Sequence, residues 1–401
     1  MERYVFIGGI YPDFKMEEIR NKFGNLPQDA ADLFEKNIIN GLEENLSAPV
    51  TVFNTYFLPA SFCKFEKVSA YEWQGKYGTN FNLSYTRNRI IGSDSKTLSI
   101  KKAVSEWLDE NDANDKINVI VYPAYYPFLK AINQLKKKYR LNVCLIVPDL
   151  PEFMGLTHKR TLYNKITQNH SSNQIRKYIG AVDSFVFLTE AMEEKLNVYN
   201  KPFRIIEGIA PSGYKYPLKN KSDFKRRIVY SGRLQLKYGI DVYLKAISLI
   251  EDKTLSFEFY GTGEGAQKIK ECSEKDKRIK YMGYRLFDEL QSIQQNSLML
   301  INPRQNVHEF TKYSFPSKTM EYMMSARPVI AYKLDGIPDE YTQYIISPED
   351  NSPQKLADLI THYASLPESE LELIGLKARD FVLTKKDAVS QTKKIIELFN
   401  I

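Results

Sequence analysis

Residues 313–331 read YSFPSKTMEYMMSARPVIA, and the fold of the chain is best inferred outward from this stretch. Pro316 and Ser317 are typical of a helix start, because proline is tolerated where the first N–H groups have no partner. The stretch ends in the apolar run PVIA, which predicts a buried strand. The predicted buried face of the helix between them is formed by Met320, Met323 and Met324. We therefore expect a turn, a short helix and a strand, as in parallel α/β structure.

Glu321 lies inside this apolar run, where an unpaired carboxylate is costly. A carboxylate can accept two hydroxyl protons at once, so the diol of a sugar is a suitable partner. The alternative is a structural ion pair between Glu321 and either Lys318 or Arg327. Both interpretations stay open from the residues alone.

Short apolar runs bounded by turn residues alternate with helical periodicity along the rest of the chain, the pattern of parallel α/β structure. The first half contains the strand-like runs 4–7, 50–53, 119–122, 143–147 and 184–188. The second half contains 227–230, 255–260, 297–301 and 328–331. Because 401 residues exceed one ordinary core, we expect two α/β domains.

The segment Pro202–Lys225 has the composition of an interdomain connection, since prolines and glycines recur along it. We therefore expect a first domain at residues 1–205 and a second at 206–384. Apolar residues at helical spacing in Asp387–Phe399 predict a final helix.

Two pairs of glycines follow predicted strands, at the edge where open α/β sheets bind ligands. Gly8 and Gly9 follow the first strand, and Gly261 and Gly263 follow a strand of the second half. Glycine lets the backbone turn tightly and approach a ligand without a Cβ in the way. An ordinary strand-to-helix turn would also explain each pair.

Gly232 begins a loop that also carries Arg233 and Lys237 before a helix predicted over residues 242–250. Backbone N–H groups and a helix N-terminus attract phosphate, and two fixed cations would clamp a diphosphate. A departing diphosphate gathers negative charge, so such cations act most strongly in the transition state. The alternative is a solvated arginine and lysine on a loop.

Together these motifs resemble the retaining glycosyltransferases of family four, which have the GT-B fold of two Rossmann-like domains facing a central cleft. The resemblance is closest over residues 227–331. It implies that Gly232, Arg233 and Lys237 grip the diphosphate of a nucleotide-sugar donor and that Glu321 binds the donor ribose. It also implies retention of anomeric configuration, and arginine and lysine in place of a metal ion.

Tyr313 departs from the common family pattern, because a first glutamate is expected at its position. The local form YSFPSK is similar instead to a branch of bacterial cell-surface polysaccharide transferases. Recognition of the donor sugar is therefore expected from Ser314, Ser317 and Lys318, alongside nearby Glu309.

On the acceptor side, Asp149 follows the hydrophobic strand 143–147 and becomes a third catalytic candidate beside Arg233 and Lys237. Relatives in the family carry a histidine or aspartate at this depth near the reacting sugar. A strand-end aspartate is also a common turn former. In such enzymes the last helix commonly crosses back to the first domain, so we assign residues 385–401 there.

The segment Ser61–Lys102 contains eight basic and three acidic residues with aromatic residues among them. This composition suits an anionic membrane surface and a lipid diphosphate carrier. Single-stranded nucleic acid favours the same composition. A third interpretation is a solvated loop with some aromatics turned into the core. The net charge of +7 is mild for 401 residues and argues against nucleic acid as the partner.

Bulk composition favours a cytoplasmic protein, with contact at the inner face of the cell membrane as an option. Hydrophobic residues make up 43% and charged residues 26% of the chain, an ordinary globular balance. No run approaches the ~20 apolar residues of a membrane span, and the start lacks a signal-peptide pattern. The three cysteines are widely separated and the four histidines lack ligand spacing, so neither a metal nor a cofactor is expected.

The leading hypothesis is a hexosyltransferase. It would move a sugar from a nucleotide diphosphate, favoured to be a UDP-sugar, to a growing capsular, exopolysaccharide or O-antigen glycan or its lipid-linked precursor. A non-catalytic glycosyltransferase-like partner subunit is the first alternative, motivated by Tyr313. A nucleotide-sugar epimerase, which would convert the donor without an acceptor, is the second.

Overall fold

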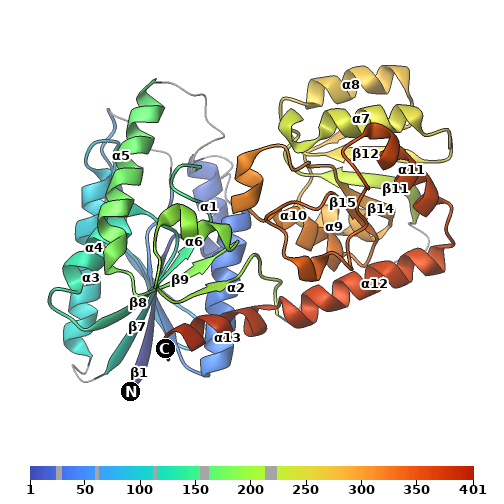
Figure 1. The fold of residues 1–401 in the computed structure, drawn as a ribbon. Coiled ribbons are helices and arrows are strands. Elements are labelled where there is room, and N and C mark those ends of the chain that lie inside the picture. Colours follow the sequence, from blue (N-terminus) through green and yellow to red (C-terminus); the bar gives the residue numbers. More distant parts are fainter. Residues whose placement is uncertain (24–28, 59–62, 112–114, 154–161, 213–223) are drawn as a thin grey trace. The chain divides into compact units, whose positions relative to one another are not determined.

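The computed structural model describes residues 1–23, 29–58, 63–111, 115–153, 162–212 and 224–401. The chain divides into two compact units (Figure 1). Unit 1 comprises Met1–Ser212 with Ala388–Ile401, and unit 2 comprises Gly213–Asp387. Most of the connection expected at 202–225 therefore belongs to unit 1 or lies at 213–223, outside the described residues.

Unit 1 is built on an eight-stranded sheet with the order β10-β9-β8-β7-β1-β2-β5-β4. Its strands run parallel except β4, which is antiparallel to β5. Their bounds are β1 Glu2–Gly8, β2 Val50–Asn54, β4 Tyr71–Gln74, β5 Thr79–Asn82, β7 Lys116–Val121, β8 Leu141–Val147, β9 Ser184–Phe187 and β10 Phe203–Ile205. A separate antiparallel ribbon pairs β3 (Glu66–Val68) with β6 (Tyr85–Arg87).

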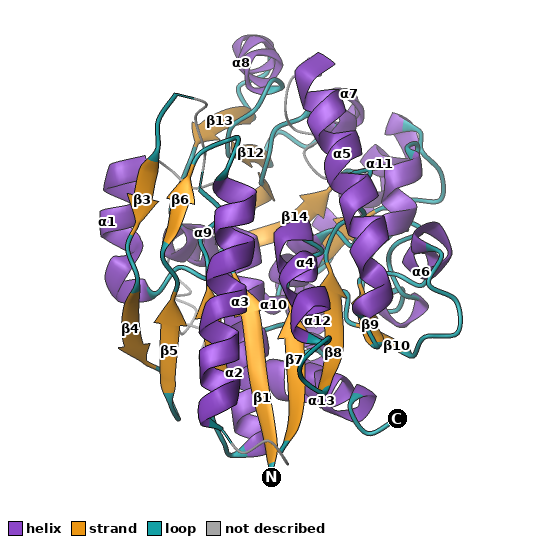
Figure 2. Ribbon diagram, turned by 90° about the vertical axis from the view of Figure 1, so that its left-hand side faces the viewer, coloured by secondary structure: helices purple, strands orange, loops and turns teal. Residues whose placement is uncertain are grey.

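Helices cover both faces of this sheet, which buries the central strands completely (Figures 1 and 2). One face carries α3 (Gly92–Glu110), α4 (Tyr126–Leu135) and α5 (Leu162–Tyr178). The other carries α2 (Asp29–Leu46) and the last helix, α13 (Ala388–Leu398). The shorter helices are α1 Asp13–Phe23 and α6 Ala191–Leu196. Two covered faces explain why the central strands are continuous apolar runs in the sequence.

The packing of α13 on α2 is close enough to require a glycine. A Cβ added at Gly41 would lie 2.3 Å from the carbonyl oxygen of Ala388. The side-chain amide of Asn45 donates to the carbonyl of Val389 at 2.8 Å and to Thr392 Oγ1 at 3.0 Å. The final helix therefore completes the hydrophobic core of unit 1 rather than that of unit 2.

Unit 2 is built on a five-stranded parallel sheet with the order β13-β12-β11-β14-β15. The strand bounds are β11 Lys225–Ser231, β12 Ser256–Tyr260, β13 Ile279–Gly283, β14 Ser297–Asn302 and β15 Val329–Ala331. The helix bounds are α7 Ile240–Leu249, α8 Ala266–Lys275, α9 Phe287–Gln295, α10 Ser317–Met324, α11 Pro353–Ala364 and α12 Glu368–Lys385. Figure 1 shows α7, α8 and α11 on one face, with α9 and α10 on the other.

The carboxyl ends of β11 and β14 lie side by side in the centre of the unit 2 sheet. Gly232, Arg233 and Lys237 lie on the loop that leads from β11 to α7, and Ser317, Lys318 and Glu321 lie on α10, the α-helix that follows β14. The expectation of a parallel α/β chain with two Rossmann-like halves is confirmed.

Candidate functional site

The junction between β11 and α10 organises the candidate site of unit 2. The hydroxyl of Tyr322 accepts a hydrogen bond from the N–H of Ser231 at 2.7 Å and donates to the Ser231 carbonyl at 2.8 Å. Tyr322 is completely buried, so these bonds form away from competing water. Helix α10 is thereby fixed against the carboxyl end of the central strand.

Glu321, the residue before Tyr322, points its carboxylate at two polar partners. Lys318 Nζ donates to Oε2 at 2.6 Å, and Gln294 Nε2 donates to Oε1 at 2.9 Å. The Glu321 side chain is 16% exposed. A carboxylate has about four lone-pair positions, so these two bonds leave acceptor capacity for a diol. The predicted structural pairing with Lys318 is therefore present, and it is compatible with ligand binding.

Arg327, the alternative ion-pair partner for Glu321, contacts other residues instead. Arg327 is buried, donates through Nε to the carbonyl of Gln295 at 2.7 Å, and lies 3.8 Å from the carboxylate of Glu368.

Lys318 also lies over the glycine that follows β11. A Cβ at Gly232 would lie 3.7 Å from Lys318 Cε, and the Gly232 φ is +151°. This dihedral favours glycine. The structure therefore brings Gly232, Lys318 and Glu321 together at one strand end.

Gly261 and Gly263 pack against the Gly232 loop itself. A Cβ at Gly261 would lie 1.8 Å from the carbonyl oxygen of Gly232, and one at Gly263 would lie 2.4 Å from that of Leu234. Both glycines have positive φ, +128° and +154°. Backbone packing therefore accounts for these two glycines without any ligand contact.

Arg233 and Lys237 extend the loop toward α7. Arg233 is exposed, while Lys237 is half-buried in a short 3-10 turn, Leu236–Tyr238. The ammonium of Lys237 lies 5.5 Å from the ring centroids of both Tyr238 and Phe310. No carboxylate of the described residues lies within ion-pair distance of either cation. Both are available to a ligand anion.

Ser314 and Ser317 occupy different settings. Ser314 accepts a hydrogen bond from Arg304 at 3.0 Å and donates to the carbonyl of Phe310 at 3.1 Å. Ser317 begins α10 and is exposed. Tyr313 is buried at the end of a 3-10 turn, Glu309–Tyr313, whose first residue is exposed.

In unit 1, the glycines after β1 are also explained by packing. A Cβ at Gly8 would lie 2.2 Å from Glu35 Oε2, and one at Gly9 would lie 2.2 Å from the ring of Phe57. Glu35 is 1% exposed and accepts the N–H of Gly9 at 2.8 Å. Burial raises the pKa of Glu35 well above its usual range. A contact between these glycines and a ligand stays a prediction.

Asp149 follows β8, at the carboxyl edge of the unit 1 sheet. Asp149 is exposed, yet desolvation by the surrounding protein atoms raises the pKa of its carboxyl to about 6. A carboxyl that titrates near neutral pH can act in proton transfer or respond to a developing charge.

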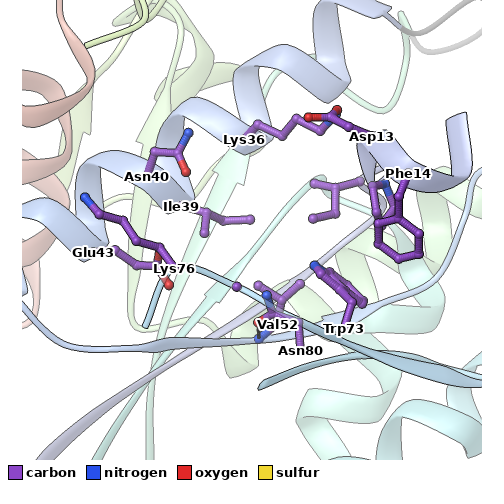
Figure 3. Close-up of a pocket in the computed structure, with 13 residues that line it drawn as sticks. Asp13, Phe14, Lys36, Ile39, Asn40, Glu43, Val52, Trp73, Lys76 and Asn80 are labelled. Atoms are coloured by element: carbon purple, nitrogen blue, oxygen red, sulfur yellow. Dashed lines mark hydrogen bonds and ion pairs between the residues drawn. The ribbon is translucent and has the colours of Figure 1, made fainter. Parts of the chain in front are cut away.

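A pocket of about 300 Å³ opens in unit 1 between α2 and the strands β2, β5 and β4 (Figure 3). Asp13 and Lys36 lie at one end, and Glu43 and Lys76 at the other, with Ile39 between them. None of the predicted site residues lines this pocket.

The segment 61–102 divides between core and surface, apart from residues 61 and 62, which lie outside the described part. Tyr85 and Lys96 are buried, and burial lowers the pKa of Lys96 to about 7. Phe65 and Tyr77 are exposed. This segment therefore places at least one aromatic side chain in the core and leaves others exposed, as the third interpretation predicts.

Two polar residues of the unit 2 site were not singled out from the sequence. Gln294 reaches Glu321 from α9, and nothing in its local pattern signals that contact. Arg304 follows β14 by two residues, and the strand-end argument applied to Arg233 applies equally to it.

The fold and these strand-end residues define a protein with the GT-B glycosyltransferase architecture. Residues 225–365 match the family model of glycosyl transferases group 1. Comparison with curated proteins gives no match.

Several solved structures share the fold over almost the whole chain. Sucrose-phosphate synthase from Thermosynechococcus elongatus has a TM-score of 0.63 at 12% identity, covering 100% of this chain and 98% of that one. An α,α-trehalose-phosphate synthase (UDP-forming) from Burkholderia xenovorans, in complex with glucose-6-phosphate, has a TM-score of 0.64 at 9% identity, and 100% of both chains is covered. Anabaena HepE in complex with UDP has a TM-score of 0.59 at 12% identity, and 99% of both chains is covered.

None of the described helices is long and apolar enough to cross a membrane. Within the described residues, no cluster of three or more histidine, cysteine or carboxylate side chains is placed to hold a metal ion.

Removal of the Tyr322 hydroxyl tests the organising contact. Tyr322→Phe leaves the Ser231 backbone without these partners, so we expect the free energy of unfolding to fall by about 1–3 kcal/mol. Urea denaturation followed by far-UV circular dichroism measures this, because both tryptophans, Trp73 and Trp107, lie in unit 1. Tyr243→Phe is the matched control, since the buried Tyr243 hydroxyl has no hydrogen-bond partner. Equal effects of the two substitutions would contradict the assignment.

Proposed function

We propose that this protein is a retaining, metal-independent hexosyltransferase that moves a sugar from a UDP-sugar to a bacterial surface glycan or its lipid-linked precursor. The observation that carries the proposal is the Glu321 carboxylate, held at the carboxyl end of β11 beside Lys318 and Gly232. It lies within residues 225–365, the segment that matches glycosyl transferases group 1. Two of the solved structures with this fold are described as UDP-forming or UDP-bound.

In this proposal the donor binds to unit 2. The free lone pairs of Glu321 accept the two hydroxyls of the ribose, while Lys318 and Gln294 hold the carboxylate in place. Arg233 and Lys237 contact the diphosphate and stabilise the charge that it gathers as it leaves. Ser314, Ser317 and Lys318 lie on the neighbouring segment and would select the sugar.

The glycan acceptor is assigned to unit 1, where the tip of the β3–β6 ribbon supports contact with a membrane. Phe65 and Ile90 are 64% and 67% exposed, far more than ordinary apolar residues. The Asn88 side chain joins their two loops by donating to the carbonyl of Lys64 at 3.1 Å and accepting from the N–H of Ile90 at 2.8 Å. Exposed apolar residues beside exposed lysines suit the surface of an anionic bilayer.

Calorimetric binding of UDP tests the donor site. Glu321→Ala removes the ribose acceptor, so we expect the affinity for UDP to fall by about tenfold or more. Glu274→Ala, an exposed carboxylate on α8, is the matched control and should bind UDP as the wild type does. An unchanged affinity in Glu321→Ala would contradict the ribose assignment.

Product analysis with a panel of UDP-, GDP- and TDP-sugars separates the proposed activity from its alternatives. Transfer to a glycan or lipid-linked acceptor supports the proposal. Transfer to a sugar phosphate would keep the enzyme class and change the acceptor. Conversion of the donor without an acceptor would indicate an epimerase. Binding without any turnover would favour a non-catalytic subunit.

The pH dependence of turnover tests Asp149. If the ionised carboxylate stabilises positive charge on the reacting sugar, activity rises as pH increases through the Asp149 pKa of about 6. Asp149→Asn should lower kcat and abolish this acidic limb, while the affinity for UDP stays unchanged. An acidic limb that persists in Asp149→Asn would show that another group is responsible.

Co-sedimentation with lipid vesicles tests the membrane surface. The wild type should bind phosphatidylcholine vesicles that contain phosphatidylglycerol, and less so those of phosphatidylcholine alone. Serine at both Phe65 and Ile90 should reduce binding about tenfold or more, because apolar burial contributes roughly 25 cal/mol per Å². Leu373→Ser, an exposed leucine on α12, is the control. Equal binding of the double variant and this control would contradict the surface.

A further inference from the structure

Arg304 is a largely enclosed cation at the carboxyl edge of the unit 2 sheet. It follows β14 by two residues, and one guanidinium nitrogen donates to Ser314 Oγ at 3.0 Å. Its Nε is buried and has no hydrogen-bond partner among the residues that the structure describes. The guanidinium carbon lies 4.4 Å from the ring centroid of Phe310 and 5.4 Å from that of Tyr238.

No carboxylate of the described residues balances the charge of Arg304. Across the described ranges of the chain, no carboxylate oxygen lies within 4.0 Å of its guanidinium; by contrast, buried Arg227 lies 3.5 Å from Glu258. Burial lowers the pKa of Arg304, yet an arginine side chain stays protonated at any ordinary pH. An enclosed cation with neutral partners alone is unfavourable, since desolvation is not repaid by an opposite charge. An anion supplied from outside the chain would repay it.

Arg304 and Lys237 lie close to the same aromatic ring, that of Phe310. The ring of Phe310 lies 4.4 Å from the guanidinium of Arg304 and 5.5 Å from the ammonium of Lys237. The backbones are in contact as well, because a Cβ at Gly239 would lie 3.2 Å from the N atom of Arg304. Gly239 has a φ of +84° and precedes α7. Two cations thus converge beside the start of a helix, where backbone N–H groups also favour an anion.

We propose that Arg304 is a further ligand of the nucleotide diphosphate, acting with Lys237 on its phosphate oxygens. The guanidinium presents a planar array of N–H donors that fits two phosphate oxygens at once. Ser314 and the two rings hold this group in place, so little side-chain freedom is lost on binding. The proposal rests on the proposed function and adds to it a diphosphate contact from the loop after β14.

Calorimetric titration with uridine, UMP, UDP and inorganic pyrophosphate tests the proposal. We expect Arg304→Gln to weaken UDP binding about tenfold or more and to leave uridine binding unchanged. Arg304→Lys keeps the positive charge but loses the planar set of guanidinium donors, so its UDP affinity should lie between those of Arg304→Gln and the wild type. Arg226→Gln changes the charge equally at the opposite end of β11, where Arg226 pairs with Asp252, and should bind as the wild type does.

The outcomes separate three explanations. An unchanged UDP affinity in Arg304→Gln would overturn the inference. An equal loss for uridine, UMP and UDP, accompanied by a lower melting temperature, would show that Arg304 is structural and would also overturn it. A wild type that binds neither uridine nor UDP would overturn the proposed function. Pyrophosphate binding that depends on Arg304 would in that case still support an anion site at this loop.

Discussion

The hydrogen bonds of the buried Tyr322 hydroxyl attach helix α10 to the central strand of unit 2, and the arrangement of the candidate site depends on them. The hydroxyl pairs with both the N–H and the carbonyl of Ser231, the last residue of the central strand β11. A hydroxyl can act as donor and acceptor at once, so one side chain fixes a helix to a strand end in both position and orientation. Glu321 precedes Tyr322 directly, and Lys318 lies one helical turn earlier. This contact therefore helps to place both residues relative to Gly232.

Positive side chains outnumber negative ones around the junction of β11 and α10. Glu321 is held by Lys318 and Gln294, while Arg233, Lys237 and Arg304 have no carboxylate partner among the described residues. Cations gathered at one edge with low-dielectric walls raise the local concentration of an anion and bind it more strongly than in water. An excess of positive charge is costly for the free protein. A ligand with two phosphates offsets that cost, and a neutral ligand does not.

Most of the fold could be predicted from the sequence because burial on both faces makes a strand a continuous apolar run. The runs at 143–147 and 297–301 are of this kind and correspond to β8 and β14. The edge strand β4 has the sequence YEWQ, in which aromatic and polar residues alternate, and its neighbour β5 has TNFN, with a single apolar residue. A short strand without a continuous apolar run has no such signal in the sequence, so these two were missed.

The candidate site was predictable to the extent that its residues belong to local motifs. Arg233, Lys318 and Glu321 stand on loops and helix starts that the sequence itself marks by glycine and proline. Gln294 reaches Glu321 from a helix that no motif marks, and its role depends on how α9 packs beside β11. Such a contact between segments distant in sequence has no local signal.

The glycines show how a correct location can have a different physical cause. Gly261 and Gly263 were singled out because glycine permits the approach of a ligand, yet the atoms that approach them are the carbonyl oxygens of Gly232 and Leu234. The N–H of Leu234 donates to the carbonyl of Thr262 at 2.9 Å, and that of Gly265 to the carbonyl of Leu234 at 2.7 Å. The two loops therefore support one another through backbone contacts. A loop fixed in this way presents its N–H groups and Arg233 in one geometry before a ligand arrives, which lowers the entropy lost on binding. In the proposed donor site, these two glycines would therefore act by making the Gly232 loop rigid, without contacting the ligand themselves.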